Sequence, residues 1–168
     1  MFTSTGGTFT GTPEINTTYY LWDPDYVPDY LCFTAEENNS TVAMIINTEY
    51  GPVTTFPALE YSRDLVSWLT FEVGSTTVSL ASGERMYLRG DNSYISPPGS
   101  TVGSINFQLS GRLAASGNLM SLLDKTCELT TIDSSACFFQ LFLNCSTLTT
   151  APKLPAIHLN EGCYGEMF

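Results

Sequence analysis

One short block of sequence occurs twice near the end of the chain, and it constrains the fold more than any other feature. The block CFFQLF at residues 137–142 returns as CYGEMF at residues 163–168, and we call the shift between the two copies the repeat offset. A period of roughly 20 to 30 residues that carries leucines, a short strand and a short helix is typical of a leucine-rich solenoid. One such unit cannot bury its own apolar face. We therefore expect the segment to pack on the preceding domain, on further chain beyond Phe168, or on another chain.

The segment from Cys137 to Phe168 resembles the BspA-like leucine-rich repeats of surface proteins from gut Bacteroidetes and of phages that infect them. Between the two blocks, Leu148, Leu154 and Ile157 are spaced through polar residues and two prolines. Shorter stretches upstream fit the same architecture, so that the resemblance covers about residues 30–168. These stretches are residues 31–36, 61–68, 82–90 and 116–123. The resemblance implies a surface-displayed protein.

The rest of the chain predicts a mainly β protein that begins with an Ig-like β-sandwich. Only 14% of the residues are charged, and β-branched or aromatic runs are separated by Gly and Pro turns every 8 to 12 residues. We expect a hairpin whose polar turn covers residues 36–40, with Trp68 and Tyr87 anchoring the core. The expected strands cover residues 19–22, 30–33, 41–46, 54–56, 59–61, 68–72, 76–80, 85–89 and 105–109.

The pattern changes after Gly111. Leu119, Leu122 and Leu123 have helical spacing, and Ser116 or Asn118 suits the N-cap of a short helix. The chain therefore divides into an extended arm (1–18), a β-sandwich domain (19–112), and a short helix plus an incomplete leucine-rich repeat (113–168). The Thr- and Gly-rich arm is either disordered or adds a strand to a neighbouring subunit.

The charge of the chain excludes one class of partner. With 17 acidic and 6 basic residues, the net charge is −11, and such a surface repels a phosphate backbone. Nucleic acid is therefore not an expected partner.

The sequence has no run of 18 apolar residues, so we expect no membrane span. The start at Met1 has neither the basic and apolar regions of a signal peptide nor a lipobox-like cysteine. If Met1 is the true start, this favours a product made in the cytoplasm, including a phage virion component.

Five cysteines leave at least one unpaired, and their spacing does not suit a zinc site. Buried reduced thiols are the favoured interpretation, and a disulfide between Cys137 and Cys163, one repeat apart, is the alternative. Asp23, Asp25 and Asp29 offer oxygen ligands for Ca²⁺, but the twelve-residue calcium-loop pattern is absent, so a solvated Pro/Asp loop is favoured. We expect no metal and no cofactor.

Catalytic patterns are sparse, and we expect no catalytic residues. The only histidine is His158, and there is no Gly-x-Ser-x-Gly elbow. Two catalytic arrangements remain as alternatives: a Cys137/His158 pair, and a pair of carboxylates of the kind that glycosidases use. The chain is therefore expected not to be an enzyme, and a carbohydrate-active enzyme is a remote alternative.

Aromatic residues near the arm form the candidate binding site. Aromatic faces suit both carbohydrate and protein contacts, and ordinary core or interface packing is the competing interpretation. The candidate residues are Tyr19, Tyr20, Trp22, Tyr26 and Tyr30.

These observations favour a non-enzymatic structural and binding protein on a virion surface, of fibre, decoration or tail type, that presents a host- or glycan-binding module. The alternative is a fragment of a bacterial cell-surface leucine-rich-repeat adhesin. Expected partners are other virion or surface proteins, reached through the arm and the repeat segment, and a host glycan or protein receptor. We expect a homo-oligomer, in which weak contacts gain avidity from copy number.

Overall fold

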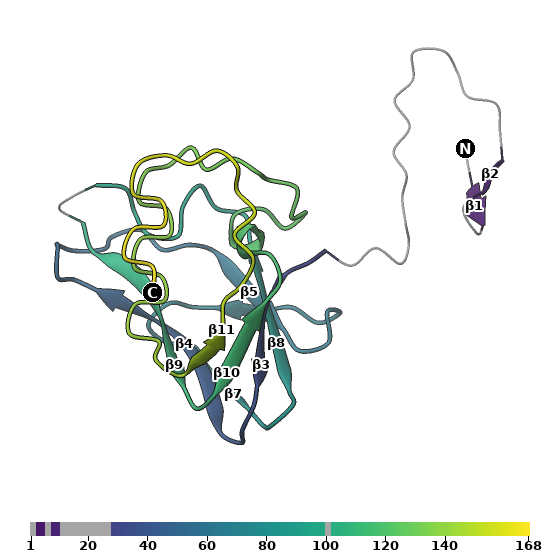
Figure 1. Ribbon diagram of the computed structural model, residues 1–168, viewed down its shortest axis with the longest axis horizontal. Coiled ribbons are helices and arrows are strands. Elements are labelled where there is room, and N and C mark those ends of the chain that lie inside the picture. The colour runs from purple at the N-terminus through teal and green to yellow at the C-terminus, as the bar shows by residue number, and fades with distance from the viewer. Residues whose placement is uncertain (1–2, 6–7, 11–27, 100–101) are drawn as a thin grey trace, which may run out of the picture.

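A computed structural model describes residues 3–5, 8–10, 28–99 and 102–168, and the chain is mainly β, as the sequence predicts (Figure 1). Within the arm, β1 (Thr3–Thr5) and β2 (Thr8–Thr10) pair as an antiparallel hairpin. The other strands are β3 (Leu31–Ala35), β4 (Ser40–Asn47), β5 (Leu59–Ser62), β6 (Leu69–Phe71), β7 (Thr77–Leu80), β8 (Arg85–Gly90), β9 (Ser104–Ser110), β10 (Leu113–Ser116) and β11 (Leu148–Thr150).

These nine strands form two sheets. The larger sheet has the order β11-β10-β3-β8-β5-β6, and the smaller one has the order β7-β4-β9. All neighbours are antiparallel except β10 and β11, which are parallel. The predicted hairpin around residues 36–40 is wrong, because β3 belongs to the larger sheet and β4 to the smaller one. The polar turn, in which Asn39 has a φ of 63°, carries the chain from one sheet to the other.

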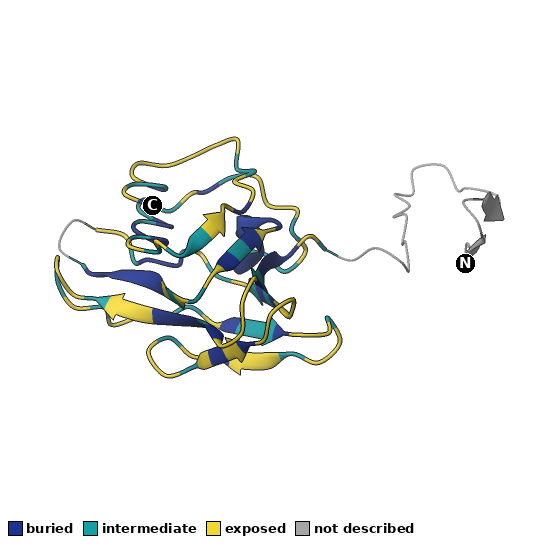
Figure 2. Cartoon of the chain, turned by 60° about the horizontal axis from the view of Figure 1, so that its bottom comes forward, coloured by how far each residue is buried: buried dark blue, intermediate teal, exposed yellow. Residues whose placement is uncertain are grey.

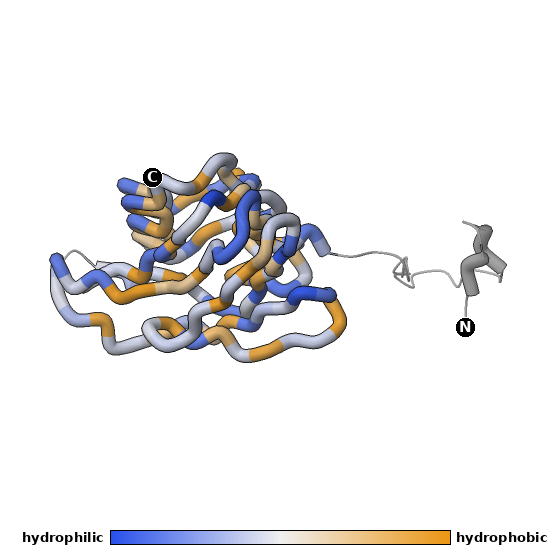
Figure 3. The backbone as a smooth tube through the Cα atoms, turned by 90° about the horizontal axis from the view of Figure 1, so that it is seen from below, coloured by the Kyte–Doolittle hydropathy of each residue, from blue (hydrophilic) through white to orange (hydrophobic). Residues whose placement is uncertain are grey.

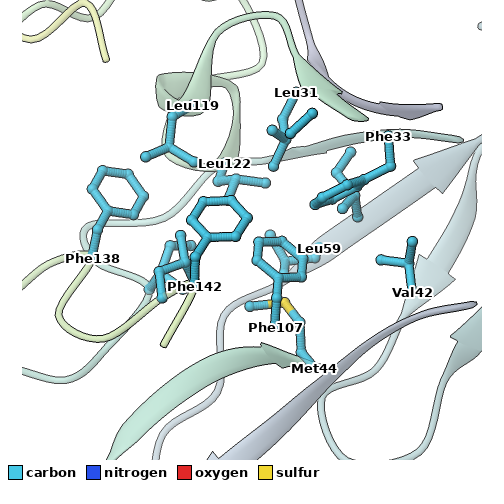
Figure 4. Packing of buried hydrophobic residues seen from close by; sticks show 14 of the residues in the cluster. Leu31, Phe33, Val42, Met44, Leu59, Phe107, Leu119, Leu122, Phe138 and Phe142 are labelled. Carbon is cyan, nitrogen blue, oxygen red and sulfur yellow. The ribbon is translucent and has the colours of Figure 1, made fainter. Parts of the chain in front are cut away.

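The core lies between the sheets and extends into the C-terminal segment. Phe33 of β3 meets Phe107 of β9 edge to face, with ring centroids 5.0 Å apart, and Phe107 stacks on Phe142 at 5.0 Å. All three rings are at most 2% exposed (Figure 4). Buried residues therefore line the facing sides of both sheets (Figure 2). Exposed and buried residues alternate in β7, whereas most residues of β3 and β9 are buried.

Three details of the predicted β region need correction. Trp68 and Tyr87 are half-buried and do not anchor the core. In β8 the side chains alternate between the two faces of the sheet, so the core positions go to Met86 and Leu88, both fully buried, and Tyr87 faces outward. Residues 54–56 form no strand and lead as an irregular segment into β5.

The predicted helix is present as one 3₁₀ turn, Leu119–Leu122, with Asn118 as its N-cap. The Asn118 side-chain oxygen accepts a 2.8 Å hydrogen bond from the Met120 backbone N–H. The strand β10 occupies the positions just before it. Gly117, with a φ of +75°, joins the two elements where a Cβ atom would collide with the Tyr30 carbonyl oxygen.

The two copies of the repeated block lie side by side. We call residues 132–142 the inner coil and residues 158–168 the outer coil; their turns lie one over the other near the C-terminus (Figure 3). Backbone N–H groups of Phe138, Gln140 and Phe142 donate to carbonyl oxygens of the outer coil at 2.9, 2.9 and 2.8 Å. The acceptors belong to Cys163, Gly165 and Met167.

Side chains of the two coils pair at the repeat offset. Phe138 stacks on Tyr164 with centroids 5.7 Å apart, and Phe142 stacks on Phe168 at 5.5 Å. Between these rings, the Gln140 Nε2 donates a 2.8 Å hydrogen bond to the Glu166 carboxylate. All three pairs join equivalent positions of the two blocks, so the sequence period is also the stacking period of the coils.

Candidate binding site on the larger sheet

Of the predicted binding residues, only Tyr30 belongs to the part of the chain that the structure describes. Its ring is 9% exposed and meets the ring of Trp68 edge to face, with centroids 5.1 Å apart. Tyr30 thus contributes to the support of Trp68 rather than offering an open face. The other four candidates, Tyr19, Tyr20, Trp22 and Tyr26, lie outside the described residues, as do Asp23 and Asp25. Of the three aspartates considered for Ca²⁺, the described Asp29 pairs with Lys153 at 2.8 Å.

Trp68 carries a stacked cation. The Arg89 guanidinium carbon lies 3.7 Å from the centroid of the Trp68 ring and 5.8 Å from that of Tyr30. The Arg89 Nε donates a 2.9 Å hydrogen bond to Glu60, its neighbour across β5 and β8. An arginine suits this position because its planar fork stacks and donates hydrogen bonds at the same time.

The loop before Trp68 is held by Asp64. Its Oδ1 accepts hydrogen bonds from the backbone N–H groups of Val66 and Ser67 at 2.9 and 2.7 Å. Ser62 adds a hydroxyl donor at 3.0 Å. The backbone donors of Ser67 and Val66, followed by the Ser62 hydroxyl, lower the pKa of Asp64 to about 2. The charged carboxylate therefore orders the loop that presents Trp68.

Beside this cluster lies an open cleft of about 600 Å³. It forms where the chain enters β5 and leaves β6, which is the edge strand of the larger sheet. Phe56, half exposed, and Val73 supply apolar surface, and Glu72 and Asp91 supply carboxylates. The remaining lining residues are Pro57, Ala58, Leu59, Glu60, Thr70, Phe71, Ser75 and Lys125.

The position of the cleft is fixed by Asn92, which follows β8. Its Oδ1 accepts from the Ala58 N–H at 2.8 Å, and its Nδ2 donates to the carbonyl oxygens of Ala58 and Leu122. Gly90 lies under this clamp, since an added Cβ would approach the Ala58 oxygen to 2.7 Å and the Leu122 oxygen to 2.8 Å. The wall that carries Phe56 is thereby tied to the 3₁₀ turn.

Glu60 lines the cleft and also binds Arg89, and its surroundings favour the charged carboxylate. Hydrogen bonding from Arg89 lowers the pKa of Glu60, and Lys125 lies 3.5 Å from the same carboxylate and 3.3 Å from Asp91. A general acid of a glycosidase needs a raised pKa. Glu60 is therefore suited to accepting hydrogen bonds from a bound hydroxyl-rich ligand and unsuited to donating a proton.

Three of the cysteines lie in environments that suppress the reactivity of their thiols. Burial raises the pKa of Cys127 and Cys137 to about 12 and that of Cys145 to about 11, so the thiolate form is rare at neutral pH. All five cysteines are free thiols, Cys137 and Cys163 included. Within the described ranges, no three or more metal-ligating side chains cluster. His158 is exposed on the outer coil, where its backbone bridges Thr131.

No direct signal in the sequence pointed to this site, because its parts come from separate strands and loops. The alternation of Arg85, Tyr87 and Arg89 with Met86 and Leu88 was the available indication that one face of β8 is polar and aromatic. Among the described residues there is no helix with the length and apolar character needed to cross a bilayer. Comparison with protein-family models, with curated proteins and with solved structures finds no match to this chain.

Proposed function

We propose that this chain is a non-enzymatic structural and binding protein of a virion surface, of fibre, decoration or tail type, and that it presents a glycan-binding module. The observation that carries the proposal is the cleft beside β5 and β6. It combines the exposed ring of Phe56 with the carboxylate of Glu60, whose charged form is favoured, and with the exposed carboxylates of Glu72 and Asp91. An aromatic face and fixed hydrogen-bond acceptors are what a sugar ring requires of a binding site.

The proposed architecture is an Ig-like sandwich followed by an incomplete BspA-like leucine-rich repeat. The two-sheet arrangement supports the first part, and the stacking of the coils at the repeat offset supports the second. A bacterial cell-surface adhesin is the second candidate, favoured by the same stacked coils, since repeats of this kind resemble those of gut surface proteins. A carbohydrate-active enzyme is the remote candidate, and the lowered pKa of Glu60 argues against it.

Glycan binding is tested by screening the full chain against an array of bacterial and mucosal glycans, followed by calorimetry on any hit. We expect millimolar to micromolar binding that Phe56→Ala weakens at least about tenfold, which corresponds to about 1.4 kcal/mol. Phe168→Ala is the matched control, because Phe168 is a similarly exposed phenylalanine at 61%, on the outer coil away from the cleft-lining residues. Binding that is equally sensitive to both changes, or turnover of the bound glycan, contradicts the proposal.

Display in multiple copies is tested by light scattering after size exclusion, with and without residues 1–18. We expect an oligomer that dissociates when the arm is removed, because an arm of this composition suits strand addition to a neighbour. A monomer in both forms would remove the homo-oligomer from the proposal and favour an adhesin module.

A further inference from the structure

The outer coil has a row of backbone N–H donors without acceptors among the described residues, whereas the equivalent donors of the inner coil are hydrogen-bonded. In the inner coil, five N–H groups donate to the outer coil: that of Ile132 and, at alternate positions, those of Ala136, Phe138, Gln140 and Phe142. The counterparts of the last four at the repeat offset are Gly162, Tyr164, Glu166 and Phe168. Among the residues that the structure describes, none of these four N–H groups has an acceptor. Backbone donors at such positions require water or a partner.

The side chains show the same asymmetry. Phe142 is 1% exposed and its counterpart Phe168 is 61% exposed, and the buried Gln140 corresponds to the exposed Glu166. The positions that point inward behave differently, since Cys163 and Met167 of the outer coil stay buried, as their inner-coil counterparts do. Within residues 162–168, the exposed residues are Gly162, Glu166 and Phe168, which all occupy positions that stack between coils. Two further exposed apolar residues, Ile157 at 73% and Leu159 at 54%, precede this face in the chain.

The opposite side of the stack is closed. Carbonyl oxygens of the inner coil accept from backbone N–H groups of the β region: Cys137 from Ile95 and Ser96 at 3.1 and 2.8 Å, and Leu141 from Phe107 at 2.7 Å. The Ser96 hydroxyl donates to the Phe139 carbonyl at 3.1 Å. A second copy therefore has no free row of acceptors to offer from the same side of its own stack, and two outer coils facing each other would oppose donors with donors.

We propose that the open face of the outer coil, residues 162–168, docks a coil supplied by a different protein chain. That coil offers carbonyl oxygens at alternate residues, two aromatic side chains four residues apart, and a Gln, Lys or Arg midway between them. The spacing is that of Tyr164 and Phe168 and of their partners in the inner coil. The middle residue must be a donor because Glu166 faces it, as Gln140 faces Glu166 from the inner side at 2.8 Å. A carboxylate there would repel both Glu166 and a chain of net charge −11.

The contact extends an interface that already exists within the molecule, and it is independent of the glycan cleft. In the inner interface, the backbone bonds of Phe138 and Phe142 are accompanied by stacked rings, and that of Gln140 is accompanied by the Gln140–Glu166 bond. The same chemistry is presented again on the outer side. What recognises this face is therefore a repeat coil with the pattern of residues 137–142 or 163–168 carried by a partner protein.

The first test uses the ¹⁵N-labelled full chain and a synthetic peptide of residues 146–168 with Glu166→Gln, whose carbonyl oxygens accept from a preceding coil in this protein. We expect saturable shifts and at least about tenfold slower amide exchange at Tyr164, Glu166 and Phe168 of the labelled chain. The unmodified peptide, which places a carboxylate opposite Glu166, should bind about tenfold more weakly. Phe168→Ala in the labelled chain should weaken binding about tenfold, and Phe56→Ala, a matched change at the cleft, should not.

Because a free peptide must be ordered on binding, the second test attaches the same peptide behind Phe168 through a flexible Gly/Ser linker. We expect the same three amides to become protected in the extended chain. Absence of protection in both experiments overturns the proposal. Concentration-dependent self-association that protects these amides without peptide also overturns it, because the face would then belong to a second copy. Since Phe56→Ala alters only glycan binding and Phe168→Ala only coil docking, failure of one proposal is distinguishable from failure of the other.

Discussion

Truncation of Gln140 should destabilise the whole chain, because this side chain joins the coils to the smaller sheet. Its Oε1 accepts from the Ser104 hydroxyl of β9 at 2.8 Å and from the Asn47 amide of β4 at 3.2 Å. Its Nε2 donates to Glu166 of the outer coil. Gln140 is 1% exposed, so water does not reach these bonds in the native protein. Gln140→Ala removes all three bonds at once.

The magnitude follows from the partners. A neutral hydrogen bond contributes about 0.5–1.5 kcal/mol net, and one to a charged group contributes up to about 3 kcal/mol. Glu166 is exposed and belongs at the lower end, while Ser104 keeps a second acceptor, the Asn106 Oδ1 at 3.0 Å. We therefore expect a loss of about 3 kcal/mol, a large part of the about 5–15 kcal/mol that stabilises a typical protein. For a chain of this size, that loss lowers the Tm by roughly 6–12 °C.

Urea denaturation followed by circular dichroism measures the change, with thermal unfolding as a second readout. The matched control is Gln108→Ala, since Gln108 is an exposed glutamine of β9, and we expect it to change stability by less than about 0.5 kcal/mol. If Gln140→Ala costs no more than Gln108→Ala, the coils are not fastened to the smaller sheet through this side chain.

Three further predictions concern the loop, the stacked arginine and the thiols. The pKa of Asp64 is lower in the folded chain (about 2) than its ordinary 3.8, so its ordering of the Trp68 loop is fully present above about pH 4 and is lost as the pH falls toward 2. Trp68 fluorescence in a Trp22→Phe background should follow that change, and Asp64→Asn should abolish it. Arg89→Lys should destabilise the chain by about 1 kcal/mol in urea denaturation, because an ammonium cannot both stack on Trp68 and make the same bond to Glu60. The thiols, with pKa values raised to about 11 or 12 for three of them, should react with iodoacetamide at pH 7 far more slowly in the native protein than in guanidinium chloride.

Each of these predictions has a contradicting result. A fluorescence transition that persists in Asp64→Asn assigns it to another carboxyl group. Equal stability of Arg89→Lys and the parent chain means that the stack on Trp68 contributes nothing measurable. Rapid alkylation of one native cysteine, resolved by mass spectrometry, would identify a reactive thiol and reopen the enzymatic alternative.

The stacking of the coils could be predicted from the sequence because it depends on a local pattern that occurs twice. Equivalent residues of stacked units lie at a fixed offset, and the pairs Phe138–Tyr164 and Phe142–Phe168 follow it. The N-cap at Asn118 was predictable for a similar reason, since capping depends on one side chain and the next turn.

What depends on distant partners could not be predicted. A polar turn between two strands favours a hairpin locally, yet β3 and β4 pair with other strands. The residues of the turn, 36–40, do not determine which strands those are. Trp68 was expected in the core because large aromatic residues are mostly buried. Instead its ring stacks on the guanidinium of Arg89. Arg89 lies on β8, which is distant from Trp68 in the sequence. The cleft is assembled from Phe56, Glu72, Asp91 and other residues that only the sheet brings together.

Among the described residues, the outer coil covers the inner coil at the repeat offset and leaves its own outer row of backbone donors unpaired. Residue-resolved amide hydrogen exchange of the free, full chain tests this most directly. We predict slow exchange for the N–H groups of Phe138, Gln140 and Phe142, and exchange faster by at least about a hundredfold for their counterparts in Tyr164, Glu166 and Phe168. Similar exchange rates in the two sets, whether both fast or both slow, would contradict the stacked and open arrangement.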